Sequence, residues 1–322
     1  MPDNRIQGTR RTAWLDDMRK SHSYEEMRDM FQRLYRDDAI QAINMLNDEK
    51  LSFATLHVLR PEIIKLSLWG SLSDWNRKTL EVEKDLLARR HPGRGMTGDE
   101  LRAILKWMLQ SGSDEVGLSE EYDAILDLAA LLLIKEYRET DILPLLVDII
   151  FRRHRMGLNT HDAEWALFES GTPECIAMIA RRLLSQDARD VSMARRLLKF
   201  IPRPEQDDAA AQYQWVMQWL GRNRRYLAYT GESNQKCSTP RPFQVVLEHK
   251  YLQRALDAGK LLPEEEAAVA AFSQLPSEDK ELLSEYSHYL RATGGAQWRR
   301  WMQSSLEEQI AAARRWQGVR YV

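Results

Sequence analysis

Cysteine is scarce in this sequence. Its 322 residues include two cysteines, Cys175 and Cys237. Two thiols cannot build a disulfide framework, and they cannot hold a structural metal ion without other ligands. The N-terminus, MPDNRIQGTRRTAW, carries cations but lacks the apolar stretch of a signal peptide. Because disulfides mark oxidising compartments, both features predict a cytoplasmic protein with reduced thiols.

Long apolar runs and a strong net charge are also missing. The two most apolar stretches, Glu121–Ile134 and Ile142–Phe151, fall well short of the ~20 residues that cross a bilayer. The net charge is −2, so no strong overall field attracts the chain to nucleic acid or to a membrane. With 43% hydrophobic and 29% charged residues, the composition is typical of a folded globular protein. We therefore expect no membrane partner.

Strand-like alternation is absent except near Phe243–Leu247, and helix signals take its place. Ser23 is followed three residues later by Glu26, and Thr97 by Glu100, which is the spacing of a capping box. Apolar side chains then recur at the helical period of 3.6 residues. The sequence predicts an all-α fold, an array of short antiparallel helix pairs. The helices are expected near residues 23–46, 48–58, 61–72, 73–90, 97–110, 121–134, 142–156, 160–169, 173–184, 191–201, 207–224, 244–258, 263–275, 277–292 and 297–316.

The two apolar runs are predicted to form a helical hairpin against which the other helices pack. Glu121–Ile134 is apolar on nearly every side, as expected of an innermost helix. In the second run, Pro144 suits the first helical turn, and Gly157 suits the position just after the helix. The side chains expected to be buried in this hairpin are Leu128, Leu132, Leu146 and Ile150.

A short repeat lies in the middle of the chain. The segment Ala180-Arg-Arg-Leu-Leu184 recurs as Ala194-Arg-Arg-Leu-Leu198, with residues 187–190 as a turn between them. Two short helices joined by such a turn resemble a HEAT-type unit, the antiparallel pair that stacks into α-solenoids. The resemblance is strongest over 160–201 and extends over 119–224. It implies a scaffold or binding surface, and it transfers no functional residue.

The chain is predicted to have four parts. Residues 1–21 form a flexible arm, 22–224 a helical-repeat domain, 225–243 a long loop, and 244–322 a C-terminal helical segment. Long structureless connections are usually either functional or disordered. The loop is therefore either a linker, or a binding loop that folds back with Tyr226 and Tyr229 packed and presents residues 232–236 to a partner.

Motifs for chemistry are few. Residues 93–98 match G-x-G-x-x-G, but dinucleotide binding needs a preceding strand, so a loop that leads to the Thr97 cap is favoured. Glu285 and His288 form the single E-x-x-H, whereas a di-iron bundle needs two. The sequence predicts no catalytic residue, no metal site and no cofactor. A second candidate ligand set, for which capping and ion pairing are favoured over metal binding, is His154, His161 and Glu164.

Arginine pairs recur in consecutive helices of the predicted repeat. Residues 150–225 carry thirteen Lys and Arg against nine Asp and Glu. If the pairs align, they form a basic stripe suited to phosphates or to an acidic partner. Cations also gather at helix C-termini because of the helix dipole, which is the alternative explanation. The candidate partner-binding residues are Arg152, Arg153, Arg181, Arg182, Arg195, Arg196, Arg222, Arg225, Tyr226 and Tyr229.

We therefore expect a non-enzymatic, cytosolic protein–protein interaction scaffold of the helical-repeat type. The alternative is a nucleic-acid-binding or DNA-repair-type protein that uses an arginine-rich face, because HEAT-like arrays include DNA-repair glycosylases. The second function requires the arginines on one face, with a tryptophan and a carboxylate in the groove.

Overall fold

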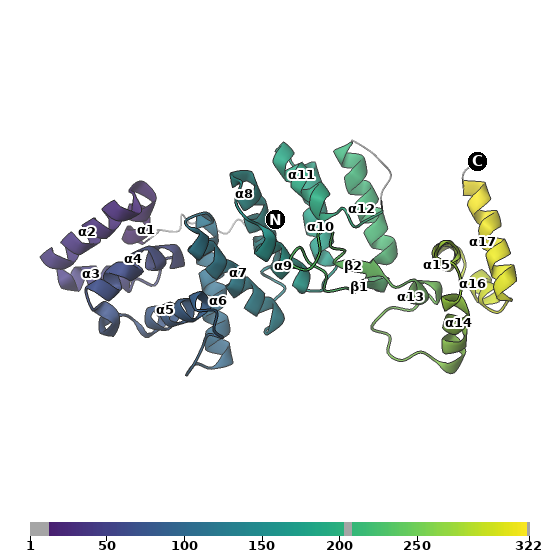
Figure 1. Cartoon of the computed structure of the whole chain (residues 1–322), viewed down its shortest axis with the longest axis horizontal. Coiled ribbons are helices and arrows are strands. Elements are labelled where there is room, and N and C mark those ends of the chain that lie inside the picture. The colour runs from purple at the N-terminus through teal and green to yellow at the C-terminus, as the bar shows by residue number, and fades with distance from the viewer. Residues whose placement is uncertain (1–12, 203–207, 321–322) are drawn as a thin grey trace, which may run out of the picture. The chain divides into compact units, whose positions relative to one another are not determined.

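The computed structural model describes residues 13–202 and 208–320 of the chain. The protein is predominantly helical (70%), with seventeen α-helices, four short 3-10 helices and one hairpin of two short strands in the described residues (Figure 1). The prediction of a mostly helical protein with many packed helices is confirmed. Residues 1–170 and 171–322 form two compact units. No helix in the described part is both long enough and apolar enough to span a membrane.

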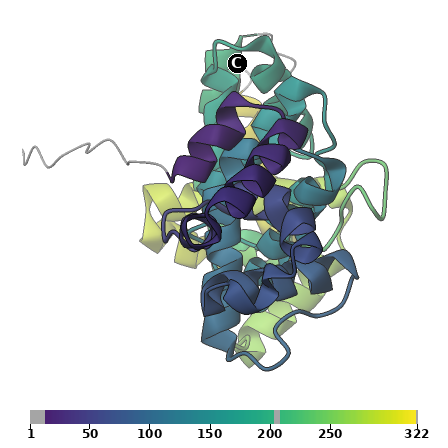
Figure 2. The same ribbon diagram turned by 90° about the vertical axis from the view of Figure 1, so that its left-hand side faces the viewer.

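From residue 13 on, the first unit contains nine α-helices, and Figure 2 shows it from the side on which its N-terminal helices face the viewer. Two short 3-10 helices, Leu68–Ser71 and Ser113–Glu115, join them. The α-helices are α1 (Trp14–Ser21), α2 (Tyr24–Asp37), α3 (Ala39–Leu46), α4 (Phe53–Lys65), α5 (Asp74–Leu87), α6 (Gly98–Gly112), α7 (Glu120–Lys135), α8 (Leu143–Met156) and α9 (His161–Glu169).

Side-chain caps set several helix boundaries. Ser23 and Glu26 form the predicted capping box at the start of α2, and Thr97 and Glu100 form the one at the start of α6. The helix expected over 23–46 is interrupted, however, because the Asp38 carboxylate accepts a hydrogen bond from the next helix, α3, at the backbone N of residue 41 (2.9 Å). The glycine motif at 93–98 lies between α5 and α6, so a helix precedes it where dinucleotide binding requires a strand.

The prediction of a flexible arm is wrong for the part of it that the structure describes. Residues 1–12 lie outside the described residues, but the next residues form α1, which packs against α2, α3 and α4. Asp16 is buried and accepts a hydrogen bond from the backbone N of Ser52 at 3.1 Å. Arg19 is also buried and pairs with Glu115 at 2.9 Å. The partners of these two side chains lie far along the chain, so the local sequence does not show the contacts.

The proline at position 61 does not end a helix, contrary to the prediction of separate helices at 48–58 and 61–72. It lies inside α4, whose residues on both sides of it are buried. A proline removes one backbone hydrogen bond from a helix. Here the helix continues because burial of its apolar side chains, among them Leu59 and Ile63, holds both halves in place.

The predicted central hairpin is only partly correct. Helix α7 packs against α5, α6 and α9, and α8 packs against α9, so the hairpin does not organise the whole protein. Leu146 and Ile150 are fully buried as expected, but Leu128 and Leu132 are only partly buried. The stripe of α7 that faces its neighbours is a different one, and it contains Tyr122, Ile125, Leu126, Ala129, Ala130, Leu133 and Ile134.

Gly112 allows a close approach between α6 and α7. The hydroxyl of Tyr122 donates a hydrogen bond to the Gly112 carbonyl at 2.9 Å. A Cβ at this position would collide with that hydroxyl and would lie 3.2 Å from side-chain carbons of Leu126 and Phe53. All three neighbours are fully buried, so they have little room to move.

We expect Gly112→Ala to lower the free energy of unfolding by about 1–3 kcal/mol, the usual cost of overpacking. Gly221→Ala is the matched control, because nothing lies within 4 Å of its added Cβ on an exposed helical surface. That control should gain up to about 1 kcal/mol from the better helix propensity of alanine. Urea denaturation of both variants measures the difference, and an equal effect of the two substitutions would contradict this packing.

The described residues of the second unit form eight α-helices and the hairpin. Two 3-10 helices, Arg182–Leu184 and Arg224–Tyr226, follow α10 and α12. Strands β1 (Leu227–Tyr229) and β2 (Phe243–Val245) pair antiparallel, with Ala228 opposite Gln244. The helices are α10 (Glu174–Arg181), α11 (Ala188–Leu197), α12 (Ala209–Asn223), α13 (Leu247–Tyr251), α14 (Pro263–Ser273), α15 (Ser277–Thr293), α16 (Gly295–Met302) and α17 (Leu306–Arg320).

The segment 225–243 is therefore not structureless throughout, and it lies inside the second unit. Its two ends are joined by the strand pair, which is continued by a hydrogen bond from the Thr230 backbone N to the Pro242 carbonyl (3.0 Å). The one stretch with strand-like alternation, Phe243–Leu247, contains β2, but the sequence does not reveal its partner β1, because three residues are too few to show alternation. The helix expected over 297–316 is also divided, into α16 and α17, and both pack on α15.

Candidate functional site

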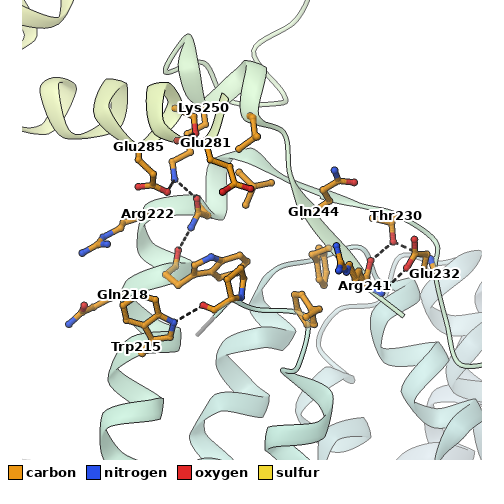
Figure 3. Close-up of a pocket in the computed structure, with 18 residues that line it drawn as sticks. Trp215, Gln218, Arg222, Thr230, Glu232, Arg241, Gln244, Lys250, Glu281 and Glu285 are labelled. Atoms are coloured by element: carbon orange, nitrogen blue, oxygen red, sulfur yellow. Dashed lines mark hydrogen bonds and ion pairs between the residues drawn. The ribbon is translucent and has the colours of Figure 1, made fainter. Parts of the chain in front are cut away.

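The second unit contains a cavity of about 590 Å³. Figure 3 shows α12 on one side of it, with Trp215, Gln218 and Arg222, and the hairpin region on the other side, with Arg241 and Gln244. Side chains of α13 and α15 complete one end. A cavity of this size, lined by aromatic and charged side chains, is typical of a binding site for a small molecule or for a few side chains of a partner.

Aromatic side chains form one wall of the cavity. Trp215 and Trp219 are four residues apart and therefore share one face of α12. The Trp215 indole N–H donates to the Pro202 carbonyl at 2.8 Å, which fixes the orientation of the ring. The ring of Phe200 lies 6.5 Å from that of Trp219 and 6.3 Å from that of Phe243. This wall offers flat apolar surface to a ligand.

Strand β2 forms the opposite wall. All three of its residues, Phe243, Gln244 and Val245, line the cavity, whereas β1 contributes none of its three residues. The described sheet has two strands, so one edge of β2 is paired with β1 and the other has no neighbouring strand. An unpaired edge offers backbone N–H and C=O groups to an added extended chain.

A buried lysine lies at the end of the cavity. Lys250 is 1% exposed, and its ammonium group donates to the Asn223 side-chain oxygen at 2.7 Å and to the Glu285 carboxylate. Burial lowers the pKa of Lys250, and the negative charge of Glu285 opposes that shift. Burial also lowers the pKa of nearby His288, whose Nδ1 has no hydrogen-bond partner. The lysine joins α12, α13 and α15 and so fixes the end wall.

Two arginines of the lining have guanidinium groups without a partner in the described part of the chain. Among the described residues, no hydrogen bond or ion pair engages the guanidinium of Arg222 or Arg241. The backbone N of Arg241 donates to the Glu232 carboxylate at 2.8 Å, and its carbonyl accepts from the Thr230 hydroxyl at 2.6 Å, so the backbone of this rim is held in place (Figure 3). Both guanidinium groups remain available to an anionic ligand.

Of the ten residues predicted to bind a partner, Arg222 alone lines this cavity. Tyr226 is buried and donates its hydroxyl to Gln253 at 3.1 Å, and Tyr229 packs on Phe243, so both tyrosines support the hairpin. Arg225 is exposed on the same unit.

The other predicted arginines divide between the two units. In the first unit, Arg152 donates to the Ser113 carbonyl at 2.8 Å, and Arg153 is fully buried against acidic side chains, which places it in the interior. In the second unit, Arg195 donates to Gln212 at 2.9 Å. Arg181 and Arg196 are exposed, and Arg182 is partly buried.

One group of potential metal ligands occurs in the described residues of the first unit. His57, Glu83 and Glu121 each offer one ligand atom, and these three atoms lie within 4.8 Å of one another. Arg60 pairs with both carboxylates, at 2.5 Å for Glu83 and 2.6 Å for Glu121. Arg60 therefore supplies the positive charge that buried Glu83 requires, and a metal ion would compete with it. Two of the candidate metal ligands named in the sequence analysis are engaged by other side chains. Glu285 forms an ion pair with Lys250, and Glu164 accepts a hydrogen bond from the Thr160 hydroxyl.

Comparison with known proteins returns no match: neither a protein-family model, nor a curated protein, nor a solved structure is similar to this chain. The site is therefore defined by its geometry alone. Most of its residues were missed in the sequence, although one local signal was present. The spacing of Trp215, Trp219 and Arg222 places two indoles and a guanidinium on one side of a helix.

Proposed function

We propose that the chain is a non-enzymatic, cytosolic interaction protein and that the cavity of its second unit binds an extended segment of a partner protein. The observation that carries this proposal is the position of β2, whose three residues line the cavity together with the tryptophans of α12 and which pairs with one strand only in the described sheet. Peptides commonly add to an open strand edge through backbone hydrogen bonds, while their alternate side chains enter pockets. Tryptophan and arginine, both present here, are the residue types most enriched at binding hot spots.

We also propose that α10 and α11 form a HEAT-type pair that supports this cavity. The two copies of the Ala-Arg-Arg-Leu-Leu segment occupy corresponding places, at the ends of α10 and α11. The 3-10 turn Arg182–Leu184 after α10 packs against α11 and α12. In this arrangement the pair acts as the scaffold that holds α12 and its tryptophans.

A second candidate function is binding of single-stranded nucleic acid, and the tryptophans favour it. Bases stack on aromatic side chains, and each stacked base contributes roughly 1–3 kcal/mol. Arg222 and Arg241 would then contact phosphates. Binding of a 20-residue oligothymidine at low salt, which weakens steeply as salt increases, would support this function over the first.

We expect Trp219→Ala to weaken peptide binding by tenfold or more, as truncation of a hot spot does. An array of random twelve-residue peptides, probed with the full chain, provides the ligands, and fluorescence anisotropy provides their dissociation constants. Gln214→Ala, on the exposed part of the same helix, is the matched control and should bind like the wild type. Unchanged peptide binding by Trp219→Ala, or an equal loss in the control, would contradict the proposed site.

A further inference from the structure

In the described residues, some charged side chains in and near the cavity have an ion-pair partner and others have none. Lys250 is paired with Glu285. Arg224, which lies two residues after the lining residue Arg222, is paired with Glu174. Arg222 is half-buried, yet among the described residues its guanidinium has no partner. A partly desolvated arginine without an anion is unfavourable, because each of its N–H groups loses water without gaining an acceptor.

The positive charge of Arg222 also acts on its surroundings. Although burial is the main cause of the lowered pKa of Lys250 and of His288, Arg222 adds to the shift in both groups. The positive charge of Arg222 therefore lies close enough to Lys250 and His288 to disfavour the protonated form of each. A single negative group placed there would relieve this repulsion and supply the missing acceptor for Arg222.

The remaining charges of the lining argue against a polyanion. Glu232, Glu281 and Glu285 line the same cavity, so a strand of regularly spaced phosphates would meet carboxylates as well as arginines. The side-chain amides of Gln218 and Gln244 and the edge of β2 suit peptide groups instead. The lining therefore fits a peptide that carries an isolated negative group beside an apolar side chain.

We propose that the cavity selects an acidic segment, in which a carboxylate or phosphate group pairs with Arg222, and an adjacent apolar side chain packs on Trp219 and Phe200. Arg241 on the opposite wall offers a second anchor for negative charge. This inference rests on the proposed function, and it names the residues that determine specificity. The guanidinium fork of arginine matches both carboxylate and phosphate oxygens, so the two sources share one chemistry.

A double-mutant cycle tests the proposal. Twelve-residue peptides are selected by display against the full chain, and the best one is synthesised with its acidic residue unchanged, replaced by glutamine, or replaced by phosphoserine. Each peptide is titrated into the wild type and into Arg222→Gln, Arg241→Gln and Trp219→Ala. The control is Arg225→Gln, which alters an exposed arginine of the same unit that does not line the cavity.

We expect selected peptides to be enriched in Asp and Glu, and the acid-to-amide change to weaken binding to the wild type by tenfold or more. In Arg222→Gln that same peptide change should have less than a twofold effect, whereas Arg225→Gln should behave like the wild type. Tighter binding of the phosphoserine peptide would assign the negative group to phosphate, and tighter binding of the unmodified peptide would assign it to carboxylate.

Two results would overturn the proposal in distinguishable ways. Peptides that require Trp219 but bind equally well as acid and amide would refute the acidic preference and leave the peptide site intact. Failure to select any peptide, with oligothymidine binding that Arg222→Gln abolishes, would refute the peptide site as well and favour nucleic acid.

Discussion

Replacing Arg153 by methionine is expected to lower the free energy of unfolding of the first unit by about 3–5 kcal/mol at pH 8, because it leaves a buried charge without its partner. Arg153 is fully buried, and its guanidinium donates to both carboxylate oxygens of Asp127 at 2.8 Å. It also donates to the Asp123 carbonyl at 3.0 Å and so joins α8 to α7 at two places. Methionine fills much of the volume and removes all of these donors.

The effect should depend on pH, because burial raises the pKa of Asp127 to about 6 from its ordinary value of 3.8, even though Arg153 opposes the shift. A carboxyl group with a raised pKa binds more protons in the folded state, so its contribution to stability is lost as pH rises through the folded pKa. Without Arg153 the pKa of Asp127 should rise further. The loss of stability in the variant should therefore be smaller at pH 5 than at pH 8.

Urea denaturation at both pH values, followed by circular dichroism, measures this difference. Arg152→Met is the control, since the neighbouring Arg152 is partly exposed and its ion pair with Asp114 is long (3.6 Å). We expect at most about 1 kcal/mol for that control, the usual range for exposed pairs. Equal effects of the two substitutions, or a larger loss at pH 5, would contradict the assigned role of Arg153.

Replacing Phe272 by alanine is expected to destabilise the second unit by about 3–5 kcal/mol, as for other fully buried aromatic side chains. Its ring is 0% exposed and stacks on that of Tyr251, with 4.5 Å between the ring centres. Tyr251 lies in α13 directly after Lys250 and packs edge-on against Trp301. The cluster around Phe272 therefore holds the helix that carries the end wall of the cavity.

Phe272→Leu is the matched control and should cost less than about 1.5 kcal/mol, since it keeps most of the buried volume. The acidic peptide should raise the free energy of unfolding of Phe272→Leu as much as that of the wild type, because it binds only the folded second unit. A loss below about 1 kcal/mol for Phe272→Ala would mean that the cluster does not stabilise α13.

Features set by neighbouring residues could be predicted from the sequence. The capping boxes at Ser23 and Thr97 depend on contacts three residues apart, so their spacing is visible in the chain. Gly157 ends α8 with a φ of 72°, as expected for a residue without Cβ in the left-handed region. The break at Asp38 is also a local cap, three residues before the backbone N that it accepts from, although it was missed in the sequence. Local spacing did not reveal that α4 continues through its proline, because burial of its side chains against distant residues decides that.

The candidate site depends on contacts that spacing cannot show. Its walls come from segments between Phe200 and Glu285, and a three-residue strand brings Phe243 to face Phe200 and Trp219. The recurrence of arginine pairs suggested one stripe, but the pairs serve different purposes. Arg153 pairs with the partly buried carboxylates of Asp123 and Asp127, whereas Arg222, beside the tryptophans, has no ion pair among the described residues. Burial and pairing separate these roles, and neither is encoded in the identity of a single residue.

Fluorine NMR of the full chain labelled with 5-fluorotryptophan tests the central claim most directly. The chain has ten tryptophans, and single Trp→Phe variants assign the resonances of Trp215 and Trp219 in the second unit and of Trp75 and Trp107 in the first. Titration with the selected acidic peptide should shift Trp215 and Trp219 and leave Trp75 and Trp107 unchanged, and Arg222→Gln should remove the response at equal peptide concentration. Peptide-induced shifts at Trp75 or Trp107 without any at Trp215 and Trp219 would contradict a binding site between α12 and β2.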